Sequence, residues 1–282
     1  SGLQSRVRRF DSGLSLHKDM KVGIIGFGFV GKAIKNGLKD SVKVFIVDPN
    51  IGSSIKDLDS FDPDIVFLCL PTPYGSKTNV QDTSIFIDVL KEIKNLSFKN
   101  ALFVLKSTIS PENLHIFDDI ERFVYNPEFL TELNANDDFI NADFSVIGGR
   151  DNQCELLKQF YKKYTKCRTN NYLFTDVISA SLIKYAINSF LATKVTFFNE
   201  LFDLFNSSGT NEDWETFIEI IKNDSRIGNT HMQVPGHDGR RGFGGACFPK
   251  DISAFSTYSK KINSNFSLLE TVIKSNNKIR QS

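Results

Sequence analysis

Short apolar runs that alternate with helical or turn-forming stretches constrain the fold of this chain more than any other feature. Lys21–Gly26, Val42–Val47 and Asp64–Leu70 are continuous apolar runs, as is typical of parallel strands buried on both faces. Strands that alternate with helices require right-handed crossovers, so the pattern predicts an α/β fold with a Rossmann-type doubly wound parallel sheet over residues 20–172. Further strands are expected at Ala101–Leu105, Arg122–Tyr125 and Asp143–Ile147, and helices at Phe29–Lys39, at Thr83–Asn95 and after Pro111.

A glycine-rich turn follows the first run. Gly26, Gly28 and Gly31 have the G-x-G-x-x-G spacing, which permits a tight turn, close approach of a pyrophosphate and close helix–strand packing. Asp48 closes the second strand 20 residues after Gly28, where a carboxylate bonds a ribose 2′-hydroxyl and repels a 2′-phosphate. The spacing predicts NAD rather than NADP, and a purely structural turn is the alternative. The expected cofactor contacts are Gly26, Gly28, Phe29, Val30, Gly31 and Asp48.

The character of the chain changes after Tyr172. Residues 176–206 contain neither glycine nor proline and place apolar residues at helical spacing, with Asp176 as N-cap and Gly209 beyond the end. Such a helix would be roughly 45 Å long, more than a compact domain needs for itself. We therefore predict an all-helical domain over residues 173–282 with one long central helix, and a homodimer formed through the 176–206 helix.

Composition excludes several classes of function. The chain has 34 Lys and Arg against 33 Asp and Glu, and this balance argues against broad binding of nucleic acid. No apolar run reaches the roughly 18 residues of a membrane span, so no membrane partner is expected. The four cysteines and four histidines lack disulfide-framework or metal-ligand spacing, which favours a cytoplasmic protein without a metal. Residues 1–19 precede Met20 and are expected to be a flexible extension or a remnant of expression.

Cys247 is the cysteine in the most reactive setting. Small residues at 244–246 precede it, and Pro249 fits the first turn of a helix, which would place the thiol at a helix N-terminus and lower its pKa. Lys250 adds positive charge and Asp251 offers a base. We therefore expect Cys247 to be a nucleophile.

Two predicted strands end in loops with ligand-binding character. Thr72 and Pro73 follow one strand and Thr108 follows another, at the sheet edge where α/β proteins bind ligands. These residues could bond a cofactor or a substrate, although ordinary turn chemistry explains them nearly as well.

Two further motifs could supply acid–base groups. Lys184 and Asn188 are i,i+4 neighbours on the long helix, where a desolvated lysine and an amide could stabilise an oxyanion. A lysine that extends to solvent from the helix flank is the alternative. Glu128 follows a strand-ending proline turn and is either a general base or a surface glutamate.

Together these motifs resemble the UDP-glucose/GDP-mannose dehydrogenase family. The resemblance covers most of residues 20–280 and rests on GFGFVG, PTP, KST, NPEFL, IKYAINSFLATKVTFFNE and SRIG…VPG…GFGGACFPKD, in that order. NPEFL and the cysteine motif are most similar to the UDP-glucose 6-dehydrogenase branch. The resemblance implies an NAD-dependent oxidation of the C6 alcohol of a nucleotide sugar to a carboxylate, through a thiohemiacetal and a thioester on the cysteine.

The resemblance also implies roles for single residues. Cys247 would be the nucleophile, and Lys184 and Asn188 would stabilise the oxyanion. Glu128, Thr108 and Asp251 would transfer protons or hold water. Further cofactor contacts would come from Thr72, Pro73, Thr108 and Glu132, and substrate contacts from Phe129, Leu130, Lys184, Asn188, Phe243, Gly244 and Arg226, the last supplied by the neighbouring subunit.

One part of the family pattern is missing from this sequence. Members normally carry a further C-terminal Rossmann-like domain that holds much of the nucleotide, and Leu268–Arg280 resembles only the entrance to it. The chain is therefore expected to be a natural minimal form, a piece of a longer protein, or a protein whose other half comes from elsewhere.

Two other functions stay open. A β-hydroxyacid dehydrogenase has a similar layout and a K-x-x-x-N helix motif, forms one NADH per substrate and would be indifferent to Cys247→Ser. A nucleotide-binding module without turnover would bind NAD and form no NADH.

Overall fold

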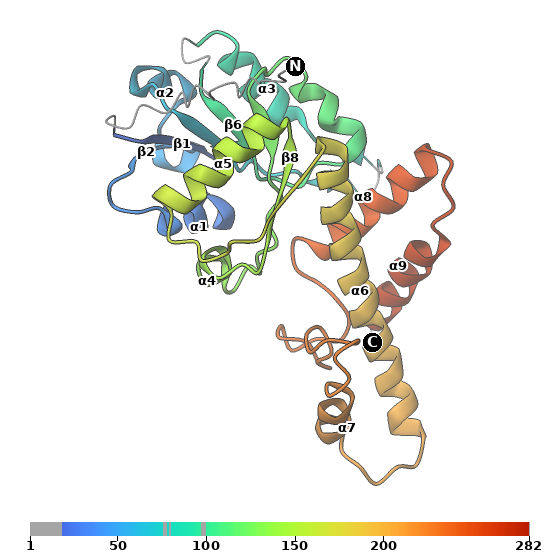
Figure 1. Cartoon of the computed structure of the whole chain (residues 1–282). Coiled ribbons are helices and arrows are strands. Elements are labelled where there is room, and N and C mark those ends of the chain that lie inside the picture. Colours follow the sequence, from blue (N-terminus) through green and yellow to red (C-terminus); the bar gives the residue numbers. More distant parts are fainter. Residues whose placement is uncertain (1–18, 76–77, 79, 97–99, 282) are drawn as a thin grey trace, which may run out of the picture.

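A Rossmann-type sheet layer and a helical part share one long helix, α6 (Val177–Ser207), which runs from the sheet to the far end of the molecule (Figure 1). The computed structural model describes residues 19–75, 78, 80–96 and 100–281, so the expected extension lies outside the described residues except for its last residue, Asp19.

Seven strands form one sheet in the order β2-β1-β3-β6-β7-β8-β9. The first five of these strands are parallel, whereas β8 pairs antiparallel with β7, and β9 is parallel to β8. The predicted doubly wound sheet is confirmed, but it is mostly rather than wholly parallel. The bounds are Lys21–Ile25 (β1), Lys43–Val47 (β2), Ile65–Leu68 (β3), Leu102–Leu105 (β6), Phe123–Tyr125 (β7), Ser145–Gly149 (β8) and Tyr172–Thr175 (β9), with a separate hairpin of Tyr74–Gly75 (β4) and Val80–Gln81 (β5).

Helices cover both faces of the sheet, because its strands are apolar on both sides. One face packs against α1 (Phe29–Gly37), α4 (Ala135–Ile140) and α5 (Asp151–Tyr164). The other packs against α2 (Ile55–Phe61), α3 (Ser84–Ile93), a 3₁₀ segment (Pro111–Phe117) and the start of α6. The helix expected after Pro111 is thus a 3₁₀ helix, and β9 extends the sheet beyond the boundary predicted at residue 172.

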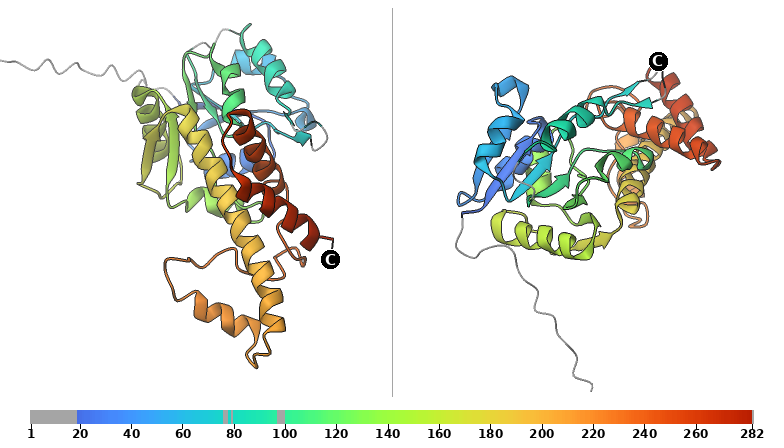
Figure 2. Two further views of the ribbon diagram at one scale, coloured as in Figure 1. Left: turned by 90° about the vertical axis from the view of Figure 1, so that its right-hand side faces the viewer. Right: turned by 90° about the horizontal axis from the view of Figure 1, so that it is seen from above.

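The helical part is built on α6. The Asp176 side chain accepts a hydrogen bond from the backbone N–H of Ser179 at 2.9 Å and so caps the helix as predicted. Next to its middle lie α8 (Phe248–Lys261) and α9 (Ser267–Ile279), and α7 (Trp214–Ile221) packs near its C-terminal end (Figure 2). Within the described ranges, no helix is both long enough and apolar enough to cross a membrane.

Candidate active site

Two side chains on the buried face of α6 each hold a carboxylate from another element. Lys184 Nζ donates to the backbone carbonyl oxygen of Glu128 at 2.6 Å and to its Oε1 at 3.3 Å. One helical turn later, Asn188 Nδ2 donates to Asp251 Oδ2 at 2.6 Å. Both carboxylate residues are buried, and Lys184 is only 2% exposed, so the alternative of a lysine reaching solvent is wrong.

Cys247 lies at the N-cap position of α8, as predicted from Pro249. The expected lowering of its pKa is wrong for the free protein. Burial raises the pKa of the thiol to about 11, and the negative charges of Glu128 and Asp251 add to the effect. Lys184 and Lys250 act in the opposite direction but are outweighed, so the thiol is protonated at neutral pH. Glu128 and Asp251 are therefore the acidic side chains whose charges act on the thiol.

The loop after β7 connects this cluster to the cysteine loop. Glu128 Oε2 accepts a hydrogen bond from Leu130 N at 2.6 Å, and Glu132 Oε1 accepts one from Ala246 N at 3.3 Å. The Phe129 ring lies 5.2 Å from Lys184 Nζ. These contacts bring together the sequence-predicted residues of the β7 loop, α6 and the start of α8.

The glycine turn has the geometry that a dinucleotide requires. Gly26 has a φ of +92°, and a Cβ on it would lie 2.5 Å from a backbone oxygen. A Cβ on Gly31 would lie 2.3 Å from Gly26 O, whereas a Cβ on Gly28 would have no described atom within 4 Å. The start of α1 shows no side-chain cap among the described residues, so its N–H groups can receive a diphosphate. The residues present therefore fit NAD, and open space exists where its diphosphate would approach.

Asp48 lies beside this turn. Its Oδ2 accepts a hydrogen bond from Phe27 N at 2.7 Å and its Oδ1 one from Asn50 N at 2.9 Å, and these bonds lower the pKa of the carboxyl. The carboxylate is thus ionised and fixed at the end of β2, the place from which a ribose contact is expected.

Thr72 and Thr108 are brought together by the fold itself. The Thr72 hydroxyl donates to the backbone oxygen of Thr108 at 2.9 Å, and Gln81 Nε2 donates to the same oxygen at 2.9 Å. The loops after β3 and β6 are therefore joined by structural hydrogen bonds. The cofactor or substrate contacts of Thr72, Pro73 and Thr108 stay predictions.

Two residues that were expected to contact substrate have other partners in the structure. The Arg226 guanidinium is exposed and pairs with Asp224 of its own chain at 2.6 Å. Its contact with the substrate of a neighbouring subunit stays a prediction. Phe243 is buried, and its ring belongs to the apolar core between α6, α8 and α9.

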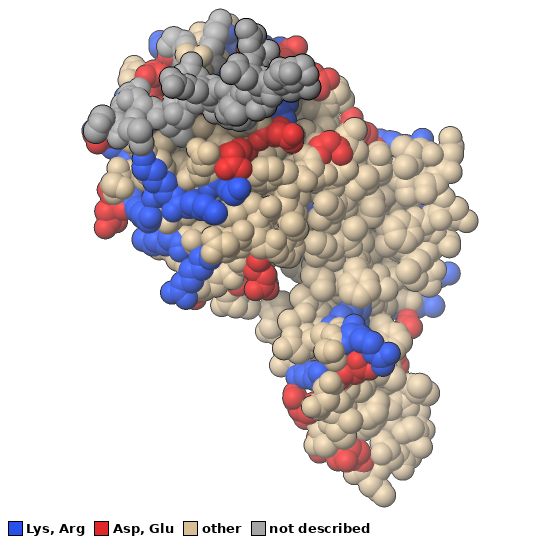
Figure 3. Space-filling model, in the orientation of Figure 1, with Lys and Arg blue, Asp and Glu red and all other residues tan. Residues whose placement is uncertain are grey.

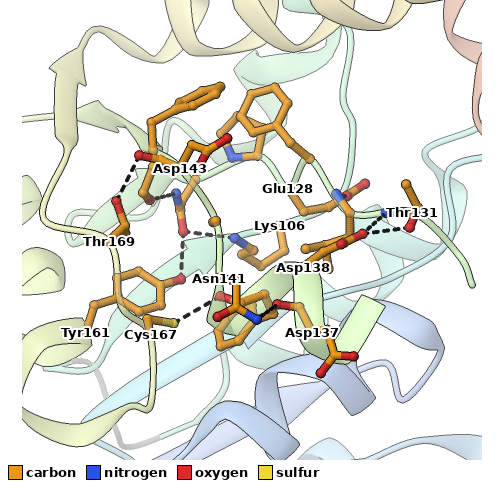
Figure 4. Close-up of a pocket in the computed structure, with 18 of the residues that line it drawn as sticks. Lys106, Glu128, Thr131, Asp137, Asp138, Asn141, Asp143, Tyr161, Cys167 and Thr169 are labelled. Carbon is orange, nitrogen blue, oxygen red and sulfur yellow. Dashed lines mark hydrogen bonds between the residues drawn. The ribbon is translucent and has the colours of Figure 1, made fainter. Parts of the chain in front are cut away.

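Lys106 is a buried cation that the sequence reasoning did not single out. It lines a cavity of about 460 Å³ beside Glu128, shown in Figure 4. Its Nζ donates to Asn126 Oδ1 at 2.9 Å, and the Tyr161 hydroxyl donates to the same oxygen at 2.7 Å. Burial lowers the pKa of Lys106 to about 8. Its position directly after a wholly apolar strand was the signal that could have revealed a buried lysine.

Two models of one protein family match most of the chain. The NAD binding domain of the UDP-glucose/GDP-mannose dehydrogenase family matches residues 52–165, and the central domain of the same family matches residues 178–278. The UDP-glucose 6-dehydrogenase of Rickettsia felis is 33% identical over 220 residues, which are 75% of this chain and 47% of that protein. The chain therefore spans about half the length of the curated relatives it matches.

Solved structures show the same fold. A UDP-glucose dehydrogenase from the hyperthermophilic archaeon Pyrobaculum islandicum superposes with a TM-score of 0.73 at 24% identity, over 94% of this chain and 70% of that one. The 3-hydroxyisobutyrate dehydrogenase of Mycobacterium tuberculosis has a TM-score of 0.70 at 15% identity, over 91% of this chain and 92% of the other. Both share the Rossmann-type sheet followed by a helical part.

Proposed function

Because the chain belongs to the UDP-glucose/GDP-mannose dehydrogenase family and contains its NAD binding and central domains, we propose that it oxidises the C6 alcohol of UDP-glucose to UDP-glucuronate. The observation that carries this proposal is that Lys184 and Asn188 of α6 hold Glu128 and Asp251 in one buried cluster, and that Asp251 N donates to the backbone oxygen of Cys247 at 2.9 Å. Relatives named UDP-glucose 6-dehydrogenase support the choice of substrate.

The proposed reaction has two oxidations, with one addition between them and a hydrolysis at the end. NAD⁺, held at the Gly26–Gly31 turn and by Asp48, supplies the acceptor for two electrons in each oxidation. The C6 hydroxyl first loses its proton to the Glu128 carboxylate while the carbon gives up a hydride and becomes an aldehyde. The Cys247 sulfur then adds to the aldehyde carbon, and its proton reaches the carbonyl oxygen through Asp251. The thiohemiacetal then gives up a second hydride and its hydroxyl proton to become a thioester. Water cleaves the carbon–sulfur bond of the thioester, which gives the carboxylate, the free thiol and one further proton.

The hydrogen-bond inventory of α6 suits the proposed oxyanion. The Lys184 ammonium has three hydrogens and uses two of them on Glu128. The Asn188 amide has two hydrogens and uses one on Asp251. Within the part of the chain that the structure describes, each side chain therefore keeps one donor for the oxygen that becomes negative when sulfur adds or water attacks. Glu128 is the proposed proton acceptor, and Thr108 would help to hold the water.

The proposal is tested by counting NADH. Purified protein, NAD⁺ and UDP-glucose should form two NADH per sugar, and Cys247→Ser should stop before the acid is released. Cys154→Ser, which changes a buried cysteine of α5, should behave as wild type. One NADH per substrate with indifference to Cys247→Ser would favour the β-hydroxyacid reaction. NAD binding by calorimetry without NADH from any nucleotide sugar would indicate a binding module and contradict the proposed turnover.

The proposed enzyme is a homodimer through α6. Phe190, Phe197 and Leu204 follow one another at intervals of seven residues and are 68%, 60% and 65% exposed. Heptad spacing keeps such side chains on one stripe, which a second helix of the same kind can cover. In Figure 3, the right-hand side of the helical part carries few charged side chains, whereas its lower end carries both Lys or Arg and Asp or Glu. A partner seated there would also bring its own loops, including the position of Arg226, close to this chain's site.

A cytoplasmic location belongs to the same proposal. The four cysteines all lie within the described residues and are free, which fits a reducing compartment.

A further inference from the structure

The glycine-rich loop that leads into Cys247 is bound by a side chain of α9. Asn276 Oδ1 accepts a hydrogen bond from the backbone N–H of Phe243 at 2.7 Å. Its Nδ2 donates to the backbone oxygen of the same residue at 3.0 Å. Asn276 is 4% exposed, so solvent does not replace either bond. One amide therefore satisfies both polar backbone groups of one loop residue and sets its position and its orientation.

The neighbouring glycines show how closely the loop approaches α9. Gly242 has a φ of +73°, and a Cβ on it would lie 2.5 Å from Asn276 Oδ1. A Cβ on Gly244 would lie 2.6 Å from a guanidinium nitrogen of Arg280. At Gly242 only glycine leaves room for α9, whereas the atoms that face Gly244 are the end of the Arg280 side chain.

The other side of the loop is held by α6. Asn199 Oδ1 accepts a hydrogen bond from Gly242 N at 2.9 Å, and Arg241 donates to the backbone oxygen of Asn199 at 2.9 Å. Two buried asparagines from two helices thus fix consecutive residues of the loop. The segment that leads from Phe243 to Cys247 therefore starts at a residue whose position is fixed by hydrogen bonds.

We propose that Asn276 is a positioning residue for the reaction of Cys247, acting through the backbone of Phe243. The proposal rests on the proposed function, because it assigns a role in the same site. Phe243 has a buried ring, and both its backbone groups are bonded to Asn276, so it anchors the loop instead of contacting the sugar. Gly244 and the following residues are then the part of the loop that faces substrate.

The first test measures the thiol without substrate or cofactor. Iodoacetamide alkylation of Cys247 is followed by peptide mass spectrometry, with buried Cys154 as an internal control for folding. Asn276→Ala should accelerate alkylation about tenfold, because a loosened loop exposes the thiol and reduces the desolvation that keeps it protonated. Val272→Ala, which removes packing from the apolar cluster around Phe243 but no hydrogen bond to its backbone, is the matched control and should change the rate less than about threefold.

The second test uses Asn276→Asp, which is isosteric. The carboxylate keeps an acceptor for Phe243 N but can donate to Phe243 O only when it is protonated. With UDP-glucose, kcat relative to wild type should therefore approach one at low pH and fall about tenfold as pH rises, while the Kd for NAD⁺ stays unchanged. A purely structural role predicts a ratio that does not vary with pH.

The outcomes separate this proposal from the proposed function. Wild-type alkylation rates in Asn276→Ala would overturn the positioning role, as would an equal acceleration in Val272→Ala at the same loss of melting temperature. If Asn276→Ala does not fold, a pH-independent ratio in Asn276→Asp would overturn it. Accelerated alkylation in a protein that forms no NADH from UDP-glucose would contradict the proposed function and leave the control of the thiol by Asn276 supported.

Discussion

The ammonium nitrogen of Lys184 lies 2.6 Å from the backbone oxygen of Glu128 and 3.3 Å from its carboxylate, so one lysine binds both ends of this residue. The two side chains are 3% and 6% exposed. A buried ion pair of this kind attaches α6 to the loop after β7. Such a pair contributes little net stability when compared with apolar residues of similar size, but removing one partner leaves an uncompensated buried charge.

Replacing this lysine alone should therefore be costly. Lys184→Met should lower the free energy of unfolding by about 3–5 kcal/mol, because the Glu128 carboxylate stays buried without its cation. Urea unfolding measures the change. The double variant Lys184→Met/Glu128→Gln should recover most of the stability but form no NADH. Equal stability of Lys184→Met and wild type would contradict the assignment of this pair.

Two glycines of the nucleotide turn should separate folding from binding. Gly28→Ala should leave the melting temperature within a few degrees of wild type, since a Cβ there meets no described atom within 4 Å, but should weaken NAD⁺ at least about tenfold in calorimetry. Gly31→Ala places a Cβ 2.3 Å from Gly26 O and should destabilise the protein by about 1–3 kcal/mol. Undiminished NAD⁺ affinity in Gly28→Ala would refute the placement of the diphosphate.

Lys106 should make stability depend on pH in a defined direction. Its pKa is lowered by burial from 10.5 to about 8, so the folded state binds the proton less tightly than the unfolded state. Between about pH 8 and 10.5 the folded protein has released this proton and the unfolded chain has not, and folding is favoured as pH rises. Compared with Lys106→Met, wild type should gain about 3 kcal/mol across that range, at about 1.4 kcal/mol per pH unit. If the free energy of unfolding had the same pH dependence in wild type and Lys106→Met, burial would not be lowering the pKa of Lys106.

The stripe on α6 should determine the oligomeric state. Phe190→Glu combined with Phe197→Glu places two charges in the proposed seam and should convert a dimer into a monomer in light scattering after gel filtration. Ile262→Glu changes an exposed apolar residue elsewhere, one that is 55% exposed, and should stay dimeric. A wild-type mass of one chain at micromolar concentration would contradict the dimer.

Much of the fold could be predicted because its signals are local. The glycine turn, the apolar strands and α6 each show their pattern within a few residues, and the predicted 176–206 helix differs from α6 by one residue at each end. The direction of β8 could not be predicted, because a short apolar run looks alike in both orientations. The strand Tyr172–Thr175 was missed because four residues carry too little periodicity to distinguish a strand from a linker.

The site was only partly accessible for a related reason. Motif residues such as Glu128, Lys184 and Asp251 were found because their sequence neighbours are distinctive. The direction in which the Cys247 pKa is shifted was not predicted, because the desolvation of the thiol depends on the loops that cover it in space. Asn276 lies among polar residues of an ordinary helix, and only its two bonds to Phe243 distinguish it.

The long helix α6 also fixes the spacing between two parts of the candidate site. Lys184 and Asn188 are separated by one turn, a rise of about 6 Å, and each holds one carboxylate, so the two points at which these carboxylates attach to α6 are spaced by the helical rise. The loops that lead to Glu128 and to α8, the helix that carries Asp251, can tolerate changes in length as long as both carboxylates still attach to α6. A residue inserted between Lys184 and Asn188 would rotate one attachment about 100° away from the other. The spacing of these two attachment points is therefore set by α6, the longest regular element that the structure describes.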